Sequence, residues 1–156
     1  MGEAQGLPLT VEDVTAGWLS DALGSVVDRA DVTGVAWGTA TKVLLDVTYA
    51  GGGDRYPGRL CVKGGFVPEL RAIMAPGYQA EARFYRDVAP GLGDGLATCF
   101  FAAVDESTGQ GVVILEDLAG GRRTGAGRAR RSGGRAQCLR GVVGVGGRAA
   151  AVIHPR

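Results

Sequence analysis

The charge of this 156-residue chain changes sign after Asp117, which is the last acidic residue of the sequence. Residues 1–117 carry 8 Lys and Arg against 16 Asp and Glu, a net charge of −8. Residues 118–156 carry 9 Arg and no Asp, Glu or Lys, a net charge of +9. The near-zero charge of the whole chain therefore averages two unlike segments, and we expect a folded unit over residues 1–118 and a separate tail over residues 119–156.

The tail contains few residues that can build a core. Of its 38 residues, 31 are Gly, Arg, Ala, Val or Pro. Burying so few large apolar side chains does not offset the conformational entropy that is lost on ordering. We therefore expect a mostly disordered, Gly/Arg-rich tail. The valines of residues 140–153 are compatible with a short strand or helix in that stretch.

Two interpretations of this tail differ in its origin. Clustered arginines such as Arg128, Arg130 and Arg131 can bind phosphate backbones, so the tail can be a basic arm for nucleic acid or an acidic partner. It has no Phe, Trp or Tyr to stack on bases. Gly, Ala, Arg and Pro are also the residues that GC-rich codons encode, and we favour an out-of-frame or truncated-gene origin. Incidental nucleic-acid binding follows in either case.

No segment of the sequence indicates secretion or a membrane. The N-terminus, residues 1–5, has neither the basic region nor the apolar run of a signal peptide. No run approaches the ~20 apolar residues that span a bilayer. The spacing of Cys61, Cys99 and Cys138 fits neither a disulfide framework nor a zinc motif. We expect a cytoplasmic protein with reduced cysteines and no membrane partner.

Apolar periodicity predicts an α+β fold for residues 1–118. Thr10 as N-cap, with Asp13 three residues later, predicts a helix over residues 11–23. A second helix is predicted just after Pro76-Gly77, with residues 79–88 as its body. The order helix, three strands, helix, two strands predicts a compact layer with a mostly antiparallel sheet and flanking helices. The strands are predicted at residues 32–37, 43–49, 59–63, 97–104 and 111–116.

Two charged residues of this unit are candidates for a binding site. Lys63 ends an apolar strand, and Glu81 lies 18 residues later on the apolar face of the second helix. A carboxylate on such a face is costly unless it meets a cation, so we expect the two side chains within about 4 Å of each other. The alternative is that Glu81 only borders the core while Lys63 extends to solvent.

Three passages, in this order, resemble the aminoglycoside phosphotransferase family and its choline-kinase-like and ecdysteroid-kinase-like relatives. They are Leu60-Cys61-Val62-Lys63, Glu81-Ala82-Arg83-Phe84-Tyr85 and Ile114-Leu115-Glu116-Asp117-Leu118. The resemblance covers about residues 8–118 and implies the small lobe of a protein-kinase-like fold. The implied reaction is ATP-dependent phosphorylation of a hydroxyl group on a small molecule.

The resemblance also implies roles for particular residues. The lysine would contact the α- and β-phosphates of ATP, the glutamate would orient the lysine, and backbone groups after the last strand would hold adenine. The loop of residues 38–42 would cover the phosphates, with two threonines as hydrogen-bond donors. Its single glycine departs from the G-x-G-x-x-G pattern. The residues implied are, in that order, Lys63, Glu81, Glu116, Asp117, Leu118, Gly38, Thr39 and Thr41.

The catalytic part of such a kinase has no counterpart in this sequence. These enzymes need an aspartate that accepts the proton of the acceptor hydroxyl, and Asn and Asp side chains that hold Mg²⁺. Past Asp117 there is no Asp, Glu or Asn, and His154 is followed only by Pro155 and Arg156. We therefore predict weak ATP binding, no catalytic or metal-ligating residue, and a truncated phosphotransferase that is inactive alone. A small-molecule acceptor would bind only if a second lobe were present. The alternative function is a small α+β binding module with a basic arm.

Overall fold

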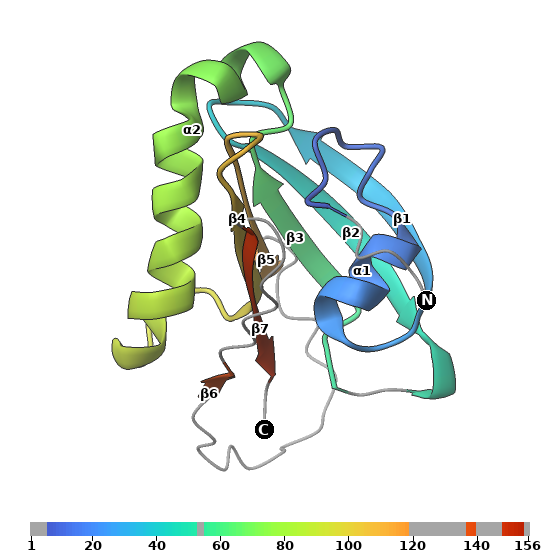
Figure 1. Ribbon diagram of the computed structural model, residues 1–156. Coiled ribbons are helices and arrows are strands. Elements are labelled where there is room, and N and C mark those ends of the chain that lie inside the picture. Colours follow the sequence, from blue (N-terminus) through green and yellow to red (C-terminus); the bar gives the residue numbers. More distant parts are fainter. Residues whose placement is uncertain (1–5, 53–54, 119–136, 140–147, 155–156) are drawn as a thin grey trace.

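The computed structural model describes residues 6–52, 55–118, 137–139 and 148–154 (Figure 1). In this part of the chain, two α-helices lie on opposite faces of one antiparallel sheet. The helices are α1 (Ala16–Leu23) and α2 (Pro68–Arg83), and short helical turns cover Ala50–Gly52, Phe84–Val88 and Ala89–Gly91. The strands are β1 (Val27–Ala36), β2 (Thr41–Tyr49), β3 (Arg59–Gly64), β4 (Cys99–Asp105), β5 (Gln110–Glu116), β6 (Gln137–Leu139) and β7 (Arg148–His154).

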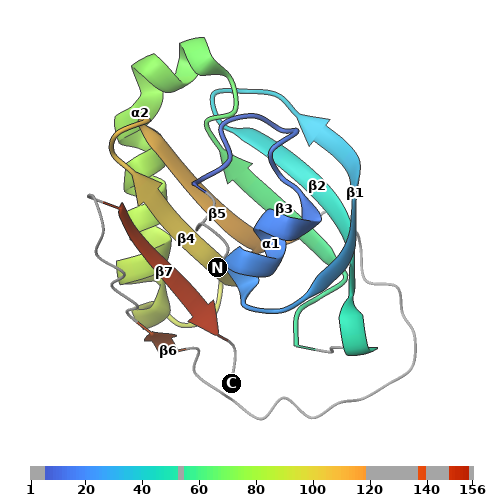
Figure 2. The ribbon, with the colours of Figure 1, turned by 45° about the vertical axis from the view of Figure 1, so that its right-hand side comes forward.

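The strands of the sheet do not follow one another in sequence order. Among the described residues the order is β1-β2-β3-β5-β4-β7-β6, and neighbouring strands are antiparallel. Strand β5 lies between β3 and β4, so the hairpin of β4 and β5 joins the first three strands through its later strand (Figure 2). No helix in the described ranges is long and apolar enough to cross a membrane. The predicted α+β fold with a mostly antiparallel sheet is confirmed.

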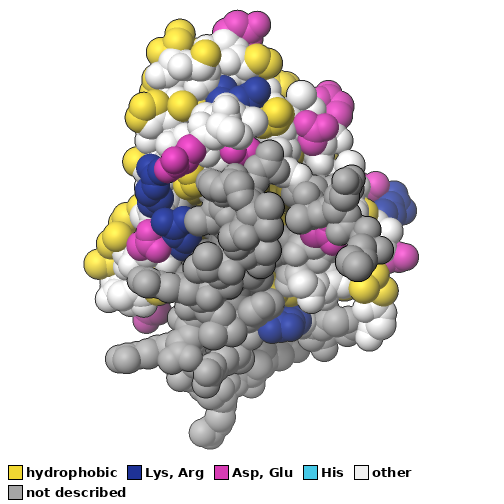
Figure 3. All heavy atoms as spheres, viewed as in Figure 1, with side chains coloured by type: hydrophobic (Ala, Val, Ile, Leu, Met, Phe, Trp, Pro, Cys, Tyr) yellow, Lys and Arg dark blue, Asp and Glu magenta, His cyan; other side chains and the backbone are white. Residues whose placement is uncertain are grey.

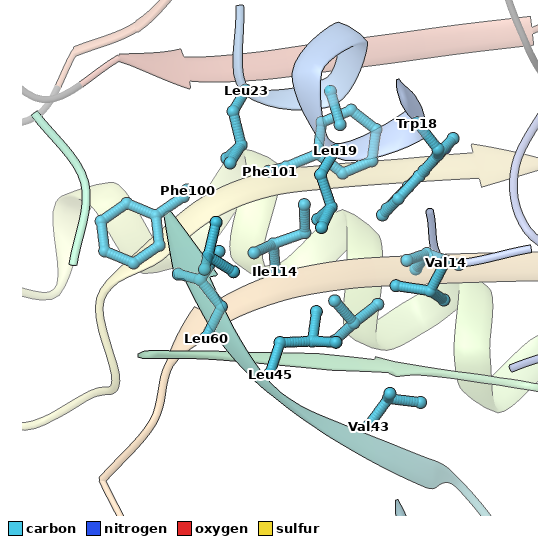
Figure 4. Packing of buried hydrophobic residues seen from close by; sticks show 14 of the residues in the cluster. Val14, Trp18, Leu19, Leu23, Val43, Leu45, Leu60, Phe100, Phe101 and Ile114 are labelled. Atoms are coloured by element: carbon cyan, nitrogen blue, oxygen red, sulfur yellow. The ribbon is translucent and has the colours of Figure 1, made fainter. Parts of the chain in front are cut away.

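The core occupies both faces of the sheet because successive side chains of a strand point to opposite faces, and β4 and β5 are buried along almost their whole length. On the α1 face, Leu60 of β3 and Ile114 of β5 are fully buried in one cluster with Leu19 of α1 (Figure 4). Trp18 packs edge-on against Phe101 in the same cluster, with ring centroids 5.7 Å apart. A smaller buried cluster on the α2 face contains Ala82, Cys99, Ala102, Val104, Val113 and Leu115.

Helix α1 begins later than the sequence predicts. Asp13 Oδ2 accepts hydrogen bonds from the backbone N–H groups of Leu9 and Thr10, at 3.1 and 2.9 Å, and so stabilises a separate turn before the helix. Thr15 is the N-cap, and its Oγ1 accepts a hydrogen bond from the N–H of Trp18 at 3.1 Å. The predicted helix over residues 11–23 is therefore wrong at its start and correct at its end.

Helix α2 begins before Pro76 and not after it. Pro68 occupies its first turn, where the missing N–H group has no helical partner to lose. An interior proline such as Pro76 costs roughly 3 kcal/mol or more. Tertiary contacts offset this cost, because Tyr78 and Ala82 of the same helix are buried. The helical body reaches residue 88 as predicted, but residues 84–88 form a π-helical turn and not a further α-helical turn.

Two glycines allow α2 to lie close to the sheet. A Cβ atom on Gly111 of β5 would lie 2.2 Å from the carbonyl oxygen of Tyr78 and 2.8 Å from the backbone nitrogen of Gln79. A Cβ atom on Gly65 would lie 2.5 Å from the Tyr78 ring. A larger residue at either position would displace the helix or the ring, so glycine sets how closely α2 approaches β5.

A buried amide joins the N-terminal segment to this region. Gln110 is fully buried, and its Oε1 accepts a hydrogen bond from the N–H of Gly65 at 2.9 Å. Its Nε2 donates to the carbonyl oxygen of Pro8 at 2.7 Å. Arg71 Nη1 of α2 donates to the carbonyl oxygens of Leu9 and Gly65, at 2.8 and 2.6 Å. These hydrogen bonds hold residues 8–9 against α2 and β5.

The strands predicted for residues 1–118 are all present. The largest difference is at β1, which begins at Val27 and not at residue 32. The prediction began the strand too late because Asp28, Arg29 and Asp31 hide the apolar pattern of its first half. The pairing of Asp105 with Gln110 confirms the predicted hairpin turn between β4 and β5. The prediction of a disordered tail falls largely outside the described residues. Within residues 119–156 the structure describes β7, which pairs with β4, and β6, which pairs with β7.

Candidate functional site

Lys63 and Glu81 form an ion pair between the sheet and helix α2. Lys63 lies near the end of β3, and Glu81 lies in the last turn of α2. Lys63 Nζ lies 2.6 Å from Glu81 Oε1. The side chains are 23% and 30% exposed, so a ligand can still reach the ammonium group. The predicted salt bridge is confirmed.

The register of the sheet places a second lysine beside this pair. Lys42 of β2 lies opposite Lys63, and Val113 of β5 lies opposite Lys63 on its other side. Directly opposed residues share one face of an antiparallel sheet. Lys42 and Lys63 therefore form a basic row on the α2 face, in which Glu81 holds Lys63.

The next row on this face is apolar. Leu44, Cys61 and Leu115 lie opposite one another, two residues further along their strands. Leu44 and Cys61 are only half-buried, so part of this apolar row is open to solvent. Burial raises the pKa of the Cys61 thiol, which is therefore a neutral, weakly polar group at neutral pH. The charged groups that act on this thiol are, in order of effect, Lys42, Asp117, Lys63 and Glu81.

An ionic row follows where β5 ends. Arg59 of β3 lies opposite Asp46 of β2, with 3.8 Å between Arg59 Nε and Asp46 Oδ1. Arg59 Nη2 also lies 2.7 Å from Asp117 Oδ2, and the Asp117 side chain is only 4% exposed. The guanidinium group therefore ties the segment that leaves β5 to the edge of this face.

The acidic side chains at the end of β5 hold that segment in place. The backbone N–H of Glu116 donates to the carbonyl oxygen of Thr98 at 2.9 Å, and the N–H of Thr98 donates to Glu116 Oε1 at 3.1 Å. Asp117 binds Arg59, and Leu118 is 69% exposed. Both carboxylates therefore have structural partners, and so has the backbone N–H of Glu116.

The loop between β1 and β2 leads into the basic row. Gly38 and Thr39 are exposed in this loop, and the carbonyl oxygen of Thr39 accepts a hydrogen bond from the hydroxyl of Tyr78 in α2. Thr41 is the first residue of β2 and is only 1% exposed. It shares the α1 face with Val43, two residues on, so the structure does not bring Thr41 together with Lys63.

Sequence reasoning missed the residues that β2 contributes. Lys42 and Leu44 lie on the same face as Lys63 because they alternate with the buried Val43 and Leu45. That alternation is visible in the sequence. The strand register that sets Lys42 beside Lys63 is not.

The described residues near these rows do not form a metal site. On the face shown in Figure 3, described basic and acidic side chains are interspersed. No three His, Cys, Asp or Glu side chains among the described residues are grouped so that they could hold a metal ion. Because the Glu81 carboxylate is already paired with Lys63, the described residues do not fit a Mg²⁺ site.

Comparison with protein-family models, curated proteins and solved structures found no match to this chain.

Proposed function

We propose that residues 1–118 bind a nucleotide, as the small lobe of a kinase similar to the aminoglycoside phosphotransferases. The ion pair between Lys63 and Glu81 carries this proposal. In kinases, a lysine on the third strand is held against the nucleotide phosphates by a glutamate from the helix that follows. The same elements supply the two residues here, with a 2.6 Å contact between them.

The order of the three rows also supports nucleotide binding. The basic row supplies positive charge for phosphates, and the apolar row supplies a surface for a base. Backbone groups of residues 116–118, other than the N–H of Glu116, which donates to Thr98, supply hydrogen bonds. Residues two apart on a strand are about 6.6 Å apart, so the basic and ionic rows are separated by about 13 Å. This distance is on the scale of an extended nucleotide.

The proposed function is binding without turnover. Residues 118–156 contain no Asp, Glu or Asn, and the described residues do not fit a Mg²⁺ site. We therefore assign no described residue to accept the proton of an acceptor hydroxyl or to neutralise the transferred phosphoryl group. Phosphorylation of a small molecule would require a second lobe. We also propose that the protein is cytoplasmic, as the sequence leads us to expect.

Titration of the isotope-labelled chain with ATP, followed by NMR chemical shifts, tests this proposal. A single lobe leaves the adenine base largely exposed to water. We therefore expect a Kd for ATP between high micromolar and millimolar, a binding free energy of roughly −4 to −6 kcal/mol. The shifts should change along β2 and β3 and at residues 116–118. Changes confined to residues 119–156 would indicate that the arginine-rich tail binds ATP through its positive charge, and would contradict the proposal.

A matched pair of variants separates the site from general charge effects. Lys63→Ala removes the cation that Glu81 orients. We expect this variant to bind ATP roughly 5-fold more weakly than the wild-type chain, or weaker still. Arg29→Ala removes a cation from an exposed pair with Asp31 on β1, where the two side chains are 71% and 49% exposed, and should leave the affinity unchanged. Equal losses in the two variants would refute a specific role for Lys63. Hydrolysis of ATP by the wild-type chain that Lys63→Ala abolishes would refute binding without turnover.

A further inference from the structure

Tyr78 connects helix α2 to the loop between β1 and β2. Its side chain is buried, and its ring lies across Gly65, just after β3. Its hydroxyl donates a hydrogen bond to the carbonyl oxygen of Thr39 in the loop. Burial raises the pKa of this hydroxyl, which therefore keeps the proton that it donates.

The same stretch of helix that holds Lys63 also holds this loop. Tyr78 precedes Glu81 by three residues, and residues at this spacing lie on one face of a helix. Glu81 reaches Lys63 in β3, while Tyr78 reaches Thr39 in the loop. The close contact of Tyr78 with Gly111 fixes the helix against β5. The lysine and the loop are therefore positioned from one rigid support.

The hydrogen bond also fixes the direction of a backbone donor. The carbonyl oxygen of Thr39 and the N–H of Ala40 belong to one peptide group, which is planar and trans. When Tyr78 holds the oxygen, the N–H group points to the opposite side of the peptide. A loop held in this way cannot turn the Thr39 oxygen toward a phosphate, where two negatively polarised groups would repel each other.

We propose that Tyr78 is a positioning residue for the phosphates of a bound nucleotide, acting through the loop of residues 37–40. This inference rests on the proposed function, because it assigns the loop to the phosphate end of the same site. Tyr78 does not touch the ligand. It holds the loop backbone beside the basic row, so its effect depends on the presence of phosphates and not on the base.

Tyr78→Phe tests the inference, because it keeps the ring over Gly65 and removes only the hydroxyl. Tyr49→Phe is the matched control: it removes a hydroxyl that donates to the carbonyl oxygen of Pro57 at 3.0 Å, at the far end of β2. We expect Tyr78→Phe to weaken ATP binding roughly 3- to 10-fold, the usual range for one hydrogen bond, and to leave adenosine binding unchanged. Tyr49→Phe should change neither. Equal losses for ATP and adenosine, or an unchanged affinity for ATP, would overturn the inference.

A measurement without ligand separates this inference from the proposed function. Backbone order parameters of residues 38–40 should fall from about 0.85 toward about 0.6 in Tyr78→Phe and stay constant in Tyr49→Phe. If the wild-type chain binds no nucleotide, the proposed function fails and the phosphate role of Tyr78 fails with it. A loop that stays rigid in Tyr78→Phe would overturn the positioning role whatever the nucleotide result.

Discussion

Replacing Gly111 by Ala should displace helix α2 and so disturb the whole candidate site. The added Cβ atom would lie 2.2 Å from the carbonyl oxygen of Tyr78 and 2.4 Å from its carbonyl carbon. Both are backbone atoms of α2, so no side-chain rotation can relieve the clash. Ordinary contact begins at 3.4 Å, and the helix must therefore retreat from β5 by about 1 Å.

The expected loss of stability is at the upper end of the range for an overfilled core. Overpacking usually costs about 1–3 kcal/mol, and a clash between backbone atoms has few ways to relax, so we expect about 3 kcal/mol. For a unit of this size, such a loss lowers the Tm by about 10 °C or more. The ATP affinity should fall as well, because Glu81 moves away from Lys63 together with the helix.

Urea denaturation followed by the fluorescence of the buried Trp18 measures this loss. Gly34→Ala is the control, since its Cβ atom would lie 3.7 Å from Leu44 Cδ1, an ordinary contact in strand β1. Gly34→Ala should be neutral or stabilising by up to about 1 kcal/mol, because alanine restricts the unfolded chain. A Gly111→Ala protein within about 0.5 kcal/mol of Gly34→Ala would refute the reasoning.

Three further predictions concern the ion pair, the buried amide and a tyrosine. A double-mutant cycle with Lys63→Met and Glu81→Gln should give a coupling below about 1 kcal/mol in denaturation experiments, because the pair is partly exposed; a much larger value would mean that the pair stabilises the fold. Gln110→Ala should lower the free energy of unfolding by about 3 kcal/mol, because it leaves buried backbone groups without a partner. It should also speed amide hydrogen exchange in residues 9–14, and exchange there at the wild-type rate would contradict the role of the amide. Burial raises the pKa of Tyr49 to about 12 from its ordinary 10.0, so its contribution to stability is complete below pH 10 and is lost as the pH rises to 12. An absorbance titration in which Tyr49→Phe removes a step near pH 10 would contradict this shift.

The contact between Lys63 and Glu81 could be predicted from sequence because each residue is constrained locally. Glu81 falls on the apolar side of a helix, where an unpaired carboxylate is costly, and Lys63 ends the apolar strand before that helix. The strands could be predicted for a similar reason, since short apolar runs between turn residues have few other structures open to them. Both inferences need only short-range information.

The parts that sequence did not predict depend on contacts between distant segments. The helix continues through Pro76 because Tyr78 and Ala82 are buried, which propensity alone does not reveal. Thr41 appears in the sequence as a loop residue next to Lys42, yet it begins β2 and faces the opposite side of the sheet. A shift of one residue along a strand reverses the face, so site membership cannot be assigned before the register is known.

The central position of β5 determines when this unit can fold during synthesis. Strand β5 is the last of the first five strands to be made, yet it joins β3 to β4 and supplies the amide that binds Pro8, 102 residues earlier. Until Glu116 has left the ribosome, the meander of β1 to β3 has an unpaired edge that another chain can join. A change of reading frame after residue 118 comes too late to alter any of these five strands.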